Sequence, residues 1–381
     1  MKFANSLYNG IWKSSEGRKI VETILNSGLI KQNYTWYLEK FKIDPVINPT
    51  NHLGEATFTS YMREIDASDY MDMRAPLGET RPADKVGVSK YSGVIPDLAP
   101  RGFVETAAER FYKEQYFDQF GDTALVAQYA TDDIQRMIND ANLTLSYLAA
   151  KALSTGETVY DKGEGIYSAI YKSYIEDDNF VKAGAKVWSD PSALIIDYMT
   201  DIEKRFADKW GNLPQMVWEI PQDVFDNYFL KNEQIKDWVV TLNAMNNVKF
   251  PANMAMTQDL VLDAIAAHPA RLSPVTIIDM KANKGVRDGW KQGAVVFRPA
   301  GYAGYIRKAS ILDQIMLERY GNKVNEYNFT PALNGLGVIM NSVVVNGNFK
   351  EWHSDLLVKA IPTLDEFLYH VIVDTKTASN S

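Results

Sequence analysis

The residues that could do chemistry are few and widely spaced in this sequence. The four histidines are His52, His268, His353 and His370, and none stands in the HxxxH or HExxH spacing with which one helix face binds zinc. The chain has no cysteine, which excludes disulfides, thiolate nucleophiles and cysteine-ligated metal sites. We therefore expect structural roles for the histidines. His268 would contact the last carbonyls of a helix, and His370 would lie in a strand.

Carboxylates and glycines form no recognisable catalytic or binding motif either. Asp66, Asp69 and Asp72 recur every three residues but lack the glycine and the final glutamate of a calcium loop. Gly163 and Gly165 lack the third glycine and the following helix of a dinucleotide-binding loop. Neither GxxxxGK[ST] nor GxSxG occurs. We expect no catalytic, cofactor-binding or metal-ligating residue. The many carboxylates leave a carboxylate-based hydrolase as an alternative.

Length and composition are those of an ordinary globular protein. A chain of 381 residues has room for two or three domains, and it contains no apolar run long enough to cross a membrane and no secretory signal at its start. The net charge of −8 argues against nucleic-acid binding by the whole chain. Residues 1–49 nevertheless carry seven Lys/Arg against four Asp/Glu. This segment could touch nucleic acid or an acidic neighbour, or simply be solvated.

One long helix dominates the elements that would position these side chains. Apolar residues at three- and four-residue spacing predict a helix over Thr131–Ser154. Thr131 is the expected N-cap, and Asp132 and Asp133 place negative charge where the helix dipole favours it. Gly156 would close the helix. Such a helix would be roughly 36 Å long.

A long ribbon is predicted before this helix. Between Ala56 and Pro96, strand-like alternation flanks a polar tip at Ala75–Asp84, and the return strand runs from Val86 to Ile95. Pro96 and Pro100 would end the ribbon. A two-stranded ribbon is marginal in water and needs something to lie against. A long irregular loop is the alternative.

The remaining pattern predicts an α+β protein, with helices and strands in separate runs. We expect a short helix at Ser15–Asn26, a linker at Pro45–Asn51 and a disordered tail at Thr375–Ser381. Further helices are expected at Thr106–Gln119, Asp190–Gly211, Phe225–Met245 and Thr257–Ala267, and strands at Gln215–Ile220, Val275–Met280, Ala294–Arg298, Asn334–Val345 and Leu356–Val373.

The order of these features resembles the major capsid proteins of tailed bacteriophages, especially the lambda-type capsid family. Lys90–Asp97 (KYSGVIPD) resembles the end of that family's extension loop. Gly289-Trp290 and the GAVVFRPAG run of 293–301 resemble its late strand–turn element. His353–Val373, with Ile361-Pro362 before a final strand, resembles its closing segment. The resemblance covers nearly the whole chain and is carried by the order of the elements.

The resemblance implies the tailed-phage major capsid fold. It divides the chain into an N-terminal arm (1–49), an extension loop (50–104), a peripheral domain (105–184 and 331–381) with a spine helix at 131–154, and an axial domain (185–330). It also implies a structural, non-enzymatic subunit that assembles into pentamers and hexamers of an icosahedral shell. A nanocompartment shell of the encapsulin type, which has the same fold but encloses protein, is the alternative.

The resemblance names partners and interface residues as well. The partners would be copies of the same chain, packaged double-stranded DNA held by weak non-specific contacts, and scaffold, portal and decoration proteins; the virion shell would assemble in the host cytoplasm without a membrane. A covalent Lys–Asn crosslink is left open, with Lys85 and Lys90 near the ribbon tip as candidate lysines. The residues expected at subunit interfaces are Trp12, Tyr70, Met73, Arg74, Arg81, Lys85, Lys90 and Tyr91.

Overall fold

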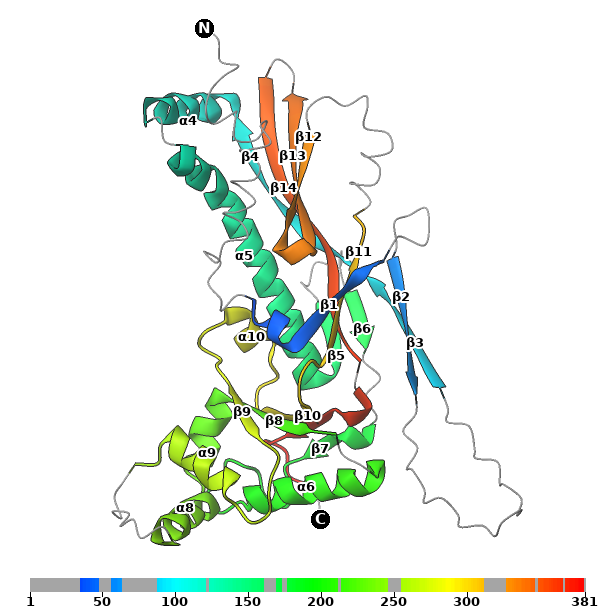
Figure 1. Cartoon of the computed structure of the whole chain (residues 1–381), viewed down its shortest axis with the longest axis vertical. Coiled ribbons are helices and arrows are strands. Elements are labelled where there is room, and N and C mark those ends of the chain that lie inside the picture. The colour runs from blue at the N-terminus through cyan, green and yellow to red at the C-terminus, as the bar shows by residue number, and fades with distance from the viewer. Residues whose placement is uncertain are drawn as a thin grey trace, which may run out of the picture.

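A computed structural model gives the arrangement of the chain (Figure 1). The residues that it describes are 35–47, 56–63, 88–120, 123–160, 169–172, 177–211, 214–245, 255–311, 327–346, 349–365 and 367–379. Two β-sheets, one long helix and a cluster of shorter helices at one end make up the body, and a narrow two-stranded ribbon stands beside it. The α+β fold class expected from the sequence is confirmed.

The long helix α5 runs over Thr123–Thr155, 33 residues, and is about 50 Å long. It begins eight residues before the expected N-cap, so Thr131 lies inside the helix and the predicted start was wrong. The preceding stretch, TALVAQYA, consists largely of strong helix formers, which extend the helix through the apparent cap. The predicted end is confirmed: Gly156 has a positive φ of 70°, and its N–H donates to the carbonyl of Ala152 at 2.9 Å.

A six-stranded sheet lies against α5. Its central strand β14 is 16 residues long and pairs antiparallel with β13, β4 and β11, while β1 joins β11 in parallel at one edge. The strands are β1 (Phe41–Ile47), β4 (Asp97–Thr106), β11 (Gly304–Ala309), β12 (Tyr327–Ala332), β13 (Gly337–Asn346) and β14 (Phe349–Leu364).

A five-stranded sheet forms the second layer, in the order β7-β15-β10-β8-β9. Its strands are β7 (Phe180–Lys182), β8 (Met216–Pro221), β9 (Val275–Ile278), β10 (Ala294–Pro299) and β15 (Val371–Asp374). The helices α6 (Ile195–Trp210), α8 (Glu233–Met245) and α9 (Gln258–Ala266) gather at the same end of the molecule (Figure 1). The helix predicted from Thr257 and the strands predicted from Gln215, Val275 and Ala294 are confirmed within a few residues.

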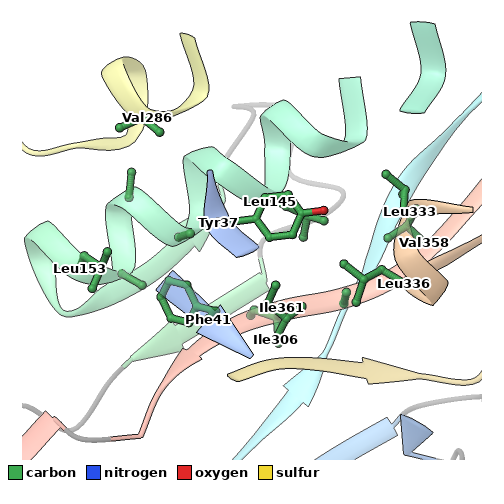
Figure 2. Close-up of a cluster of buried hydrophobic side chains, with 14 of the residues drawn as sticks. Tyr37, Phe41, Leu145, Leu153, Val286, Ile306, Leu333, Leu336, Val358 and Ile361 are labelled. Atoms are coloured by element: carbon green, nitrogen blue, oxygen red, sulfur yellow. The ribbon is translucent and has the colours of Figure 1, made fainter. Parts of the chain in front are cut away.

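The five-stranded sheet separates two hydrophobic cores. Because successive strand residues point to opposite faces, Ala294 and Val296 of β10 join the core around α5, and Val295 and Phe297 join the core of α6, α8 and α9. Figure 2 shows the first core, where Leu145 and Leu153 of α5 meet aromatic side chains of the N-terminal segment and Ile306 and Ile361 of the six-stranded sheet.

The smaller elements complete the chain. They are α3 (Tyr37–Lys40), α4 (Ala107–Phe120), α7 (Gln222–Val224) with a π-helical turn (Phe225–Phe229), α10 (Lys284–Gly289), the ribbon strands β2 (Ala56–Arg63) and β3 (Val88–Ile95), the hairpin β5 (Glu157–Tyr160) and β6 (Ala169–Lys172), and 3-10 turns at Asp177–Asn179, Leu333–Gly335 and Phe367–Tyr369. The helix predicted over Thr106–Gln119 is α4. The helix predicted at Ser15–Asn26 lies outside the described residues.

Two prolines lie inside strands, although the sequence predicted that Pro45 opens a linker and that Pro100 helps to end the ribbon. Pro45, expected to open a linker, lies in β1, where the register against β11 shifts between Ile43 and Val46. Pro100 lies in β4, next to a register shift against β14. Proline has no N–H to donate to a neighbouring strand. Both positions tolerate this, because β1 is an edge strand and each proline lies beside a break in the register. The extended chain therefore continues past Pro96 into the sheet.

The predicted start of the helix at Asp190 and the predicted disordered tail were both wrong, and hydrogen bonds explain each difference. Asp190 does not cap α6, because its carboxylate accepts from the N–H and hydroxyl of Ser192 in a turn, and the helix begins only at Ile195. The tail is not disordered over Thr375–Ser379. Thr375 is buried and donates from its hydroxyl to the carbonyl of Gly293 at 2.7 Å, and the N–H of Ser379 donates to the carbonyl of Gly184.

Candidate functional site

The ribbon is a separate two-stranded sheet that projects at the side of the body (Figure 1). β2 and β3 pair antiparallel from Ala56 opposite Ile95 to Arg63 opposite Val88. Among the described residues, neither strand pairs with a third strand. A strand edge that no other strand of the subunit covers is where another chain can add a strand. The predicted ribbon is confirmed at its base, while its tip at 75–84 lies outside the described residues.

The base of the ribbon is anchored by apolar side chains. Phe58 and Ile95 are almost fully buried in the core around α5, whereas Val94, the neighbour of Ile95, is 53% exposed. This alternation shows that one face of the ribbon base packs on the body and the other faces outward.

A cation, Arg307 of β11, joins the ribbon base to two other segments. Its guanidinium bonds Asp44 of β1 and, at 2.7 Å, Asp365, which directly follows β14. The same guanidinium lies 5.6 Å from the ring centroid of Phe58 in β2. A planar guanidinium can fork between carboxylates and stack on a ring at once. Arg307 thus holds the N-terminal segment, the ribbon and the sheet at one point.

The return strand of the ribbon is continuous with the six-stranded sheet. After β3 only Pro96 intervenes before β4, which pairs with β14 from Asp97 opposite Lys359 onward. The Lys359 side chain is 4% exposed, and its ammonium lies 3.2 Å from the Asp97 carboxylate. The ribbon is therefore an extension of a strand that is fixed inside the body.

The N-terminal segment is fixed on α5 where it enters the described residues. Tyr37 and Phe41 are buried between α5 and the six-stranded sheet (Figure 2). The Tyr37 hydroxyl donates to the side-chain carbonyl of Asn142 at 2.7 Å, and burial raises the pKa of Tyr37. The residues before Thr35 thus start from a fixed point on the subunit.

Three charges meet beside this point: Glu219 and Arg298 are buried, and Lys40 is 14% exposed. The Glu219 carboxylate of β8 accepts two bonds from the Arg298 guanidinium, at 2.8 and 3.0 Å, and lies 2.6 Å from the Lys40 ammonium. Arg298 also donates to the carbonyls of Pro299 and Gly301. Burial raises the pKa of Glu219, but Arg298 and Lys40 outweigh it and bring the pKa to about 2. Through these ion pairs the cluster binds the N-terminal segment to the five-stranded sheet.

Sequence reasoning missed both Arg307 and this cluster. The available signal was a charged residue inside an otherwise apolar strand, as in VWEIP around Glu219, VVFRP around Arg298 and YIRKA around Arg307. Such a residue must find a partner when the strand is buried. The partner itself comes from another strand or segment, so the sequence alone does not name it.

The described histidines have structural partners. The Nε2 of His370, a buried residue just before β15, lies 2.7 Å from the carbonyl of Leu153 in the last turn of α5, and burial lowers the pKa of His370 to about 4. The expectation for His268 was wrong: its Nδ1 accepts from the N–H of Ala270, and its ring meets Trp238 edge-on. His353 lies in β14 beside Glu351, and His52 lies outside the described residues.

Most residues expected at subunit interfaces also lie outside the described residues; these are Trp12, Tyr70, Met73, Arg74, Arg81 and Lys85. Lys90 and Tyr91 lie in β3, opposite Tyr61 and Ser60 of β2. Asp66, Asp69 and Asp72 fall in the segment between β2 and β3 that is not described. Their roles stay predictions.

The described part of the chain could contain two other kinds of feature, a metal site and a membrane span. It holds no group of three or more His, Asp or Glu side chains placed to bind a metal ion. None of its helices combines the length and the apolar character that a membrane span requires.

Comparison with known proteins identifies the chain. The family model of phage major capsid protein E matches residues 64–261, more than half of the 381 residues. The chain belongs to the phage major capsid protein E family. The match includes the second ribbon strand β3 and the helices α4, α5, α6 and α8, while β2 lies just before it. The chain is therefore a structural capsid subunit, assembles with copies of itself in the shell of the virion, and is not an enzyme.

Solved capsid structures are similar to the chain over most of its length. The cyanophage A-1(L) capsid subunit is 9% identical over 92% of this chain and 94% of that chain, with a TM-score of 0.47. The capsid protein of an E. coli CFT073 prophage is 16% identical over 84% and 76%, with a TM-score of 0.42. The capsid protein of Myoviridae phage XM1 is 14% identical over 89% and 91%, with a TM-score of 0.36. No curated protein sequence matches the chain.

Proposed function

We propose that the ribbon β2–β3 and the N-terminal segment are the parts of this capsid subunit that bind neighbouring subunits in an icosahedral shell of pentamers and hexamers. The ribbon carries the proposal. Its described residues form a sheet of two strands only, anchored at the base by Phe58 and Ile95, and a two-stranded sheet is marginal in water beyond the part that packs on another surface. A shell supplies that surface to every copy.

The N-terminal segment, which Arg307 joins to the ribbon base through Asp44, supports the same proposal. Its described part is fixed on the subunit by Tyr37, Phe41 and the Lys40–Glu219 ion pair. Trp12 lies in this segment and the other candidate interface residues lie in the ribbon. Interfaces of obligate assemblies bury roughly 2,000–5,000 Å², and the ribbon and the N-terminal segment of each subunit would contribute to that area.

We divide the subunit into an N-terminal arm (1–49), an extension loop (50–104), a peripheral domain (105–184 and 331–381) with α5 as its spine, and an axial domain (185–330). The two hydrophobic cores support this division, since one surrounds α5 and the other lies among α6, α8 and α9. β11 and α10 belong by sequence to the axial domain but pack in the core around α5. They form the join between the two domains.

The proposal includes what the shell encloses and where it forms. Family membership supports packaged double-stranded DNA as the content, assembly in the host cytoplasm, and scaffold, portal and decoration proteins as further partners. The chain's net charge of −8 supports weak, non-specific contact with that DNA, because most of its surface repels phosphate.

Deletion of residues 75–84, the tip of the ribbon, tests the proposal. We expect a folded subunit, with unchanged circular dichroism, that forms few or no closed shells by negative-stain microscopy and size-exclusion chromatography. A second variant replaces the same ten residues by a Gly/Ser linker and keeps the length of the chain. It should fail in the same way if the side chains of the tip bind the neighbour.

Closed shells at wild-type yield from both variants would show that the tip is not an intersubunit element. The purified wild-type shells also report their content. DNA, detected by absorbance and nuclease treatment, is expected. Shells that enclose only a protein would assign the chain to the nanocompartment class instead.

A further inference from the structure

The surface around α10 has the opposite charge to the chain as a whole. Residues 279–291 contain four Lys/Arg (Lys281, Lys284, Arg287 and Lys291) and two Asp, whereas the chain carries −8. All four cationic residues are exposed. Lys376 adds a fifth exposed cation, because its methylene groups pack beside Gly293, two residues after Lys291. These five residues are called the α10 face below.

The α10 face is held on a rigid support. A Cβ atom at Gly285 would lie 2.3 Å from the carbonyl oxygen of Leu143, and one at Gly289 equally close to that of Tyr147, so α10 packs backbone to backbone on α5. Asn283 caps α10 through the N–H of Val286 and also bonds Ser146 of α5. By helical periodicity, Lys284 and Arg287 then point away from α5.

Nearby carboxylates neutralise this charge only in part. The Asp279 carboxylate accepts from the backbone N–H groups of Lys281 and Ala282. Asp288 lies 3.4 Å from Arg287, and Asp374 lies 3.4 Å from Lys291, but these ion pairs are about a third to a half exposed and therefore weak. Within the described part of the chain, no carboxylate forms an ion pair with the Lys281 or Lys284 ammonium.

Exposed cations on α6 lie close to acidic residues in the sequence of the same helix. On α6, Lys204, Arg205 and Lys209 are interleaved with Asp201 and Asp208, and the surface of that helix has no cationic excess. The α10 face is thus a local reversal of charge on an acidic subunit. A polyanion is the partner that such a face fits.

We propose that the α10 face contacts the phosphates of the double-stranded DNA enclosed by the shell. The inference rests on the proposed function, which supplies the DNA. The contact is independent of sequence, because isolated cations on a smooth surface read phosphate and not base edges. It is also weak, since a few cations neutralise few phosphates and the surrounding surface is acidic.

The test uses the full-length subunit below its assembly concentration and a 30-base-pair duplex labelled for fluorescence anisotropy. In the variant Lys281→Gln/Lys284→Gln/Arg287→Gln, we expect affinity at low salt to fall about tenfold or more. The slope of log K against log salt should become shallower by about 2 to 3, because each lost phosphate contact removes roughly 0.9.

The matched control, Lys204→Gln/Lys231→Gln/Lys236→Gln, removes the same charge from exposed positions on α6 and around α8. Its affinity should stay within about twofold of wild type. Equal losses in both variants, or no loss in the first, would overturn the inference. Shell formation by the wild-type chain is scored separately, so a chain that binds DNA through the α10 face but forms no shells would fail the proposed function alone.

Discussion

Glu219, Lys40 and Arg298 place three charges in the interior, where each would be costly alone. Removing a carboxylate from water costs several kcal/mol, and the attraction of its partners offsets that cost only when the geometry is good. Here both carboxylate oxygens accept from Arg298, whose remaining donors bond Pro299 and Gly301. Because Lys40 belongs to the N-terminal segment, the cluster also fixes the described part of that segment to the five-stranded sheet.

Glu219→Gln should strongly destabilise the subunit, since it keeps the shape of the side chain but leaves two cations without their counter-charge. We expect a loss of about 3–5 kcal/mol in the free energy of unfolding, measured by urea denaturation. Asp288→Asn is the control. It removes a surface ion pair with Arg287 and should cost less than about 1 kcal/mol. Equal losses would show that the buried cluster contributes no more than a surface pair.

At the scale of elements, the packing of α10 on α5 depends on the absence of two side chains. Gly285 and Gly289 lie four residues apart, on one face of α10, and bring its backbone against the carbonyls of Leu143 and Tyr147. Those carbonyls belong to the face of α5 opposite Leu145, which packs toward the six-stranded sheet. The helix α5 is therefore enclosed from two sides.

Gly285→Ala should push α10 away from α5, because the new methyl group would meet a backbone oxygen that cannot rotate aside. We expect the free energy of unfolding to fall by about 1–3 kcal/mol. Lys284→Ala, at the neighbouring outward position, should change it by less than about 0.5 kcal/mol. Thermal or urea unfolding of both variants measures the difference. If Gly285→Ala proved as stable as wild type, the backbone contact would be wrong.

The elements that the sequence predicted well are those that local pattern determines. Apolar residues at three- and four-residue spacing located α5, and alternating apolar and polar residues around a polar tip located the ribbon. The start of α5 was missed because a good capping residue, Thr131, lies within a longer run of helix formers. α10 is too short to show periodicity, and its two glycines are poor helix formers. The strand β11 and its Arg307 junction depend on partners distant in sequence, which local pattern does not reveal.

At the scale of the whole molecule, acid should destabilise the fold in two pH windows. Burial lowers the pKa of His370 from 6.5 to about 4, and its charged neighbours lower that of Glu219 from 4.5 to about 2 despite burial. In both cases the unfolded chain binds the proton at higher pH than the folded chain does. Stability is therefore present above the unfolded pKa and falls as the pH drops toward the folded pKa, by about 3 kcal/mol for each group.

His370→Gln should flatten the pH dependence of the unfolding free energy between about pH 6.5 and 4 and leave the lower window intact. Glu219→Gln should do the opposite. His268, whose pKa is also lowered by burial, contributes in the upper window in the same direction, so His268→Gln serves as a comparison. Urea unfolding at a series of pH values measures the slopes. If the unfolding free energy of His370→Gln still fell with pH as steeply as that of the wild type between about pH 6.5 and 4, other groups would cause the loss of stability in that window.

The continuity of β3 with β4 has a mechanical consequence. A neighbour that pulls on the ribbon along its axis pulls on β4, which lies antiparallel to β14 from Asp97 to Thr106. The load then acts along the strands, so the hydrogen bonds between β4 and β14 share it. In a hairpin that is pulled apart from one end, by contrast, the hydrogen bonds break one after another. If the ribbon binds a neighbouring subunit as proposed, tension in the shell would load the β4–β14 pairing in shear, and the ribbon would act as the tether.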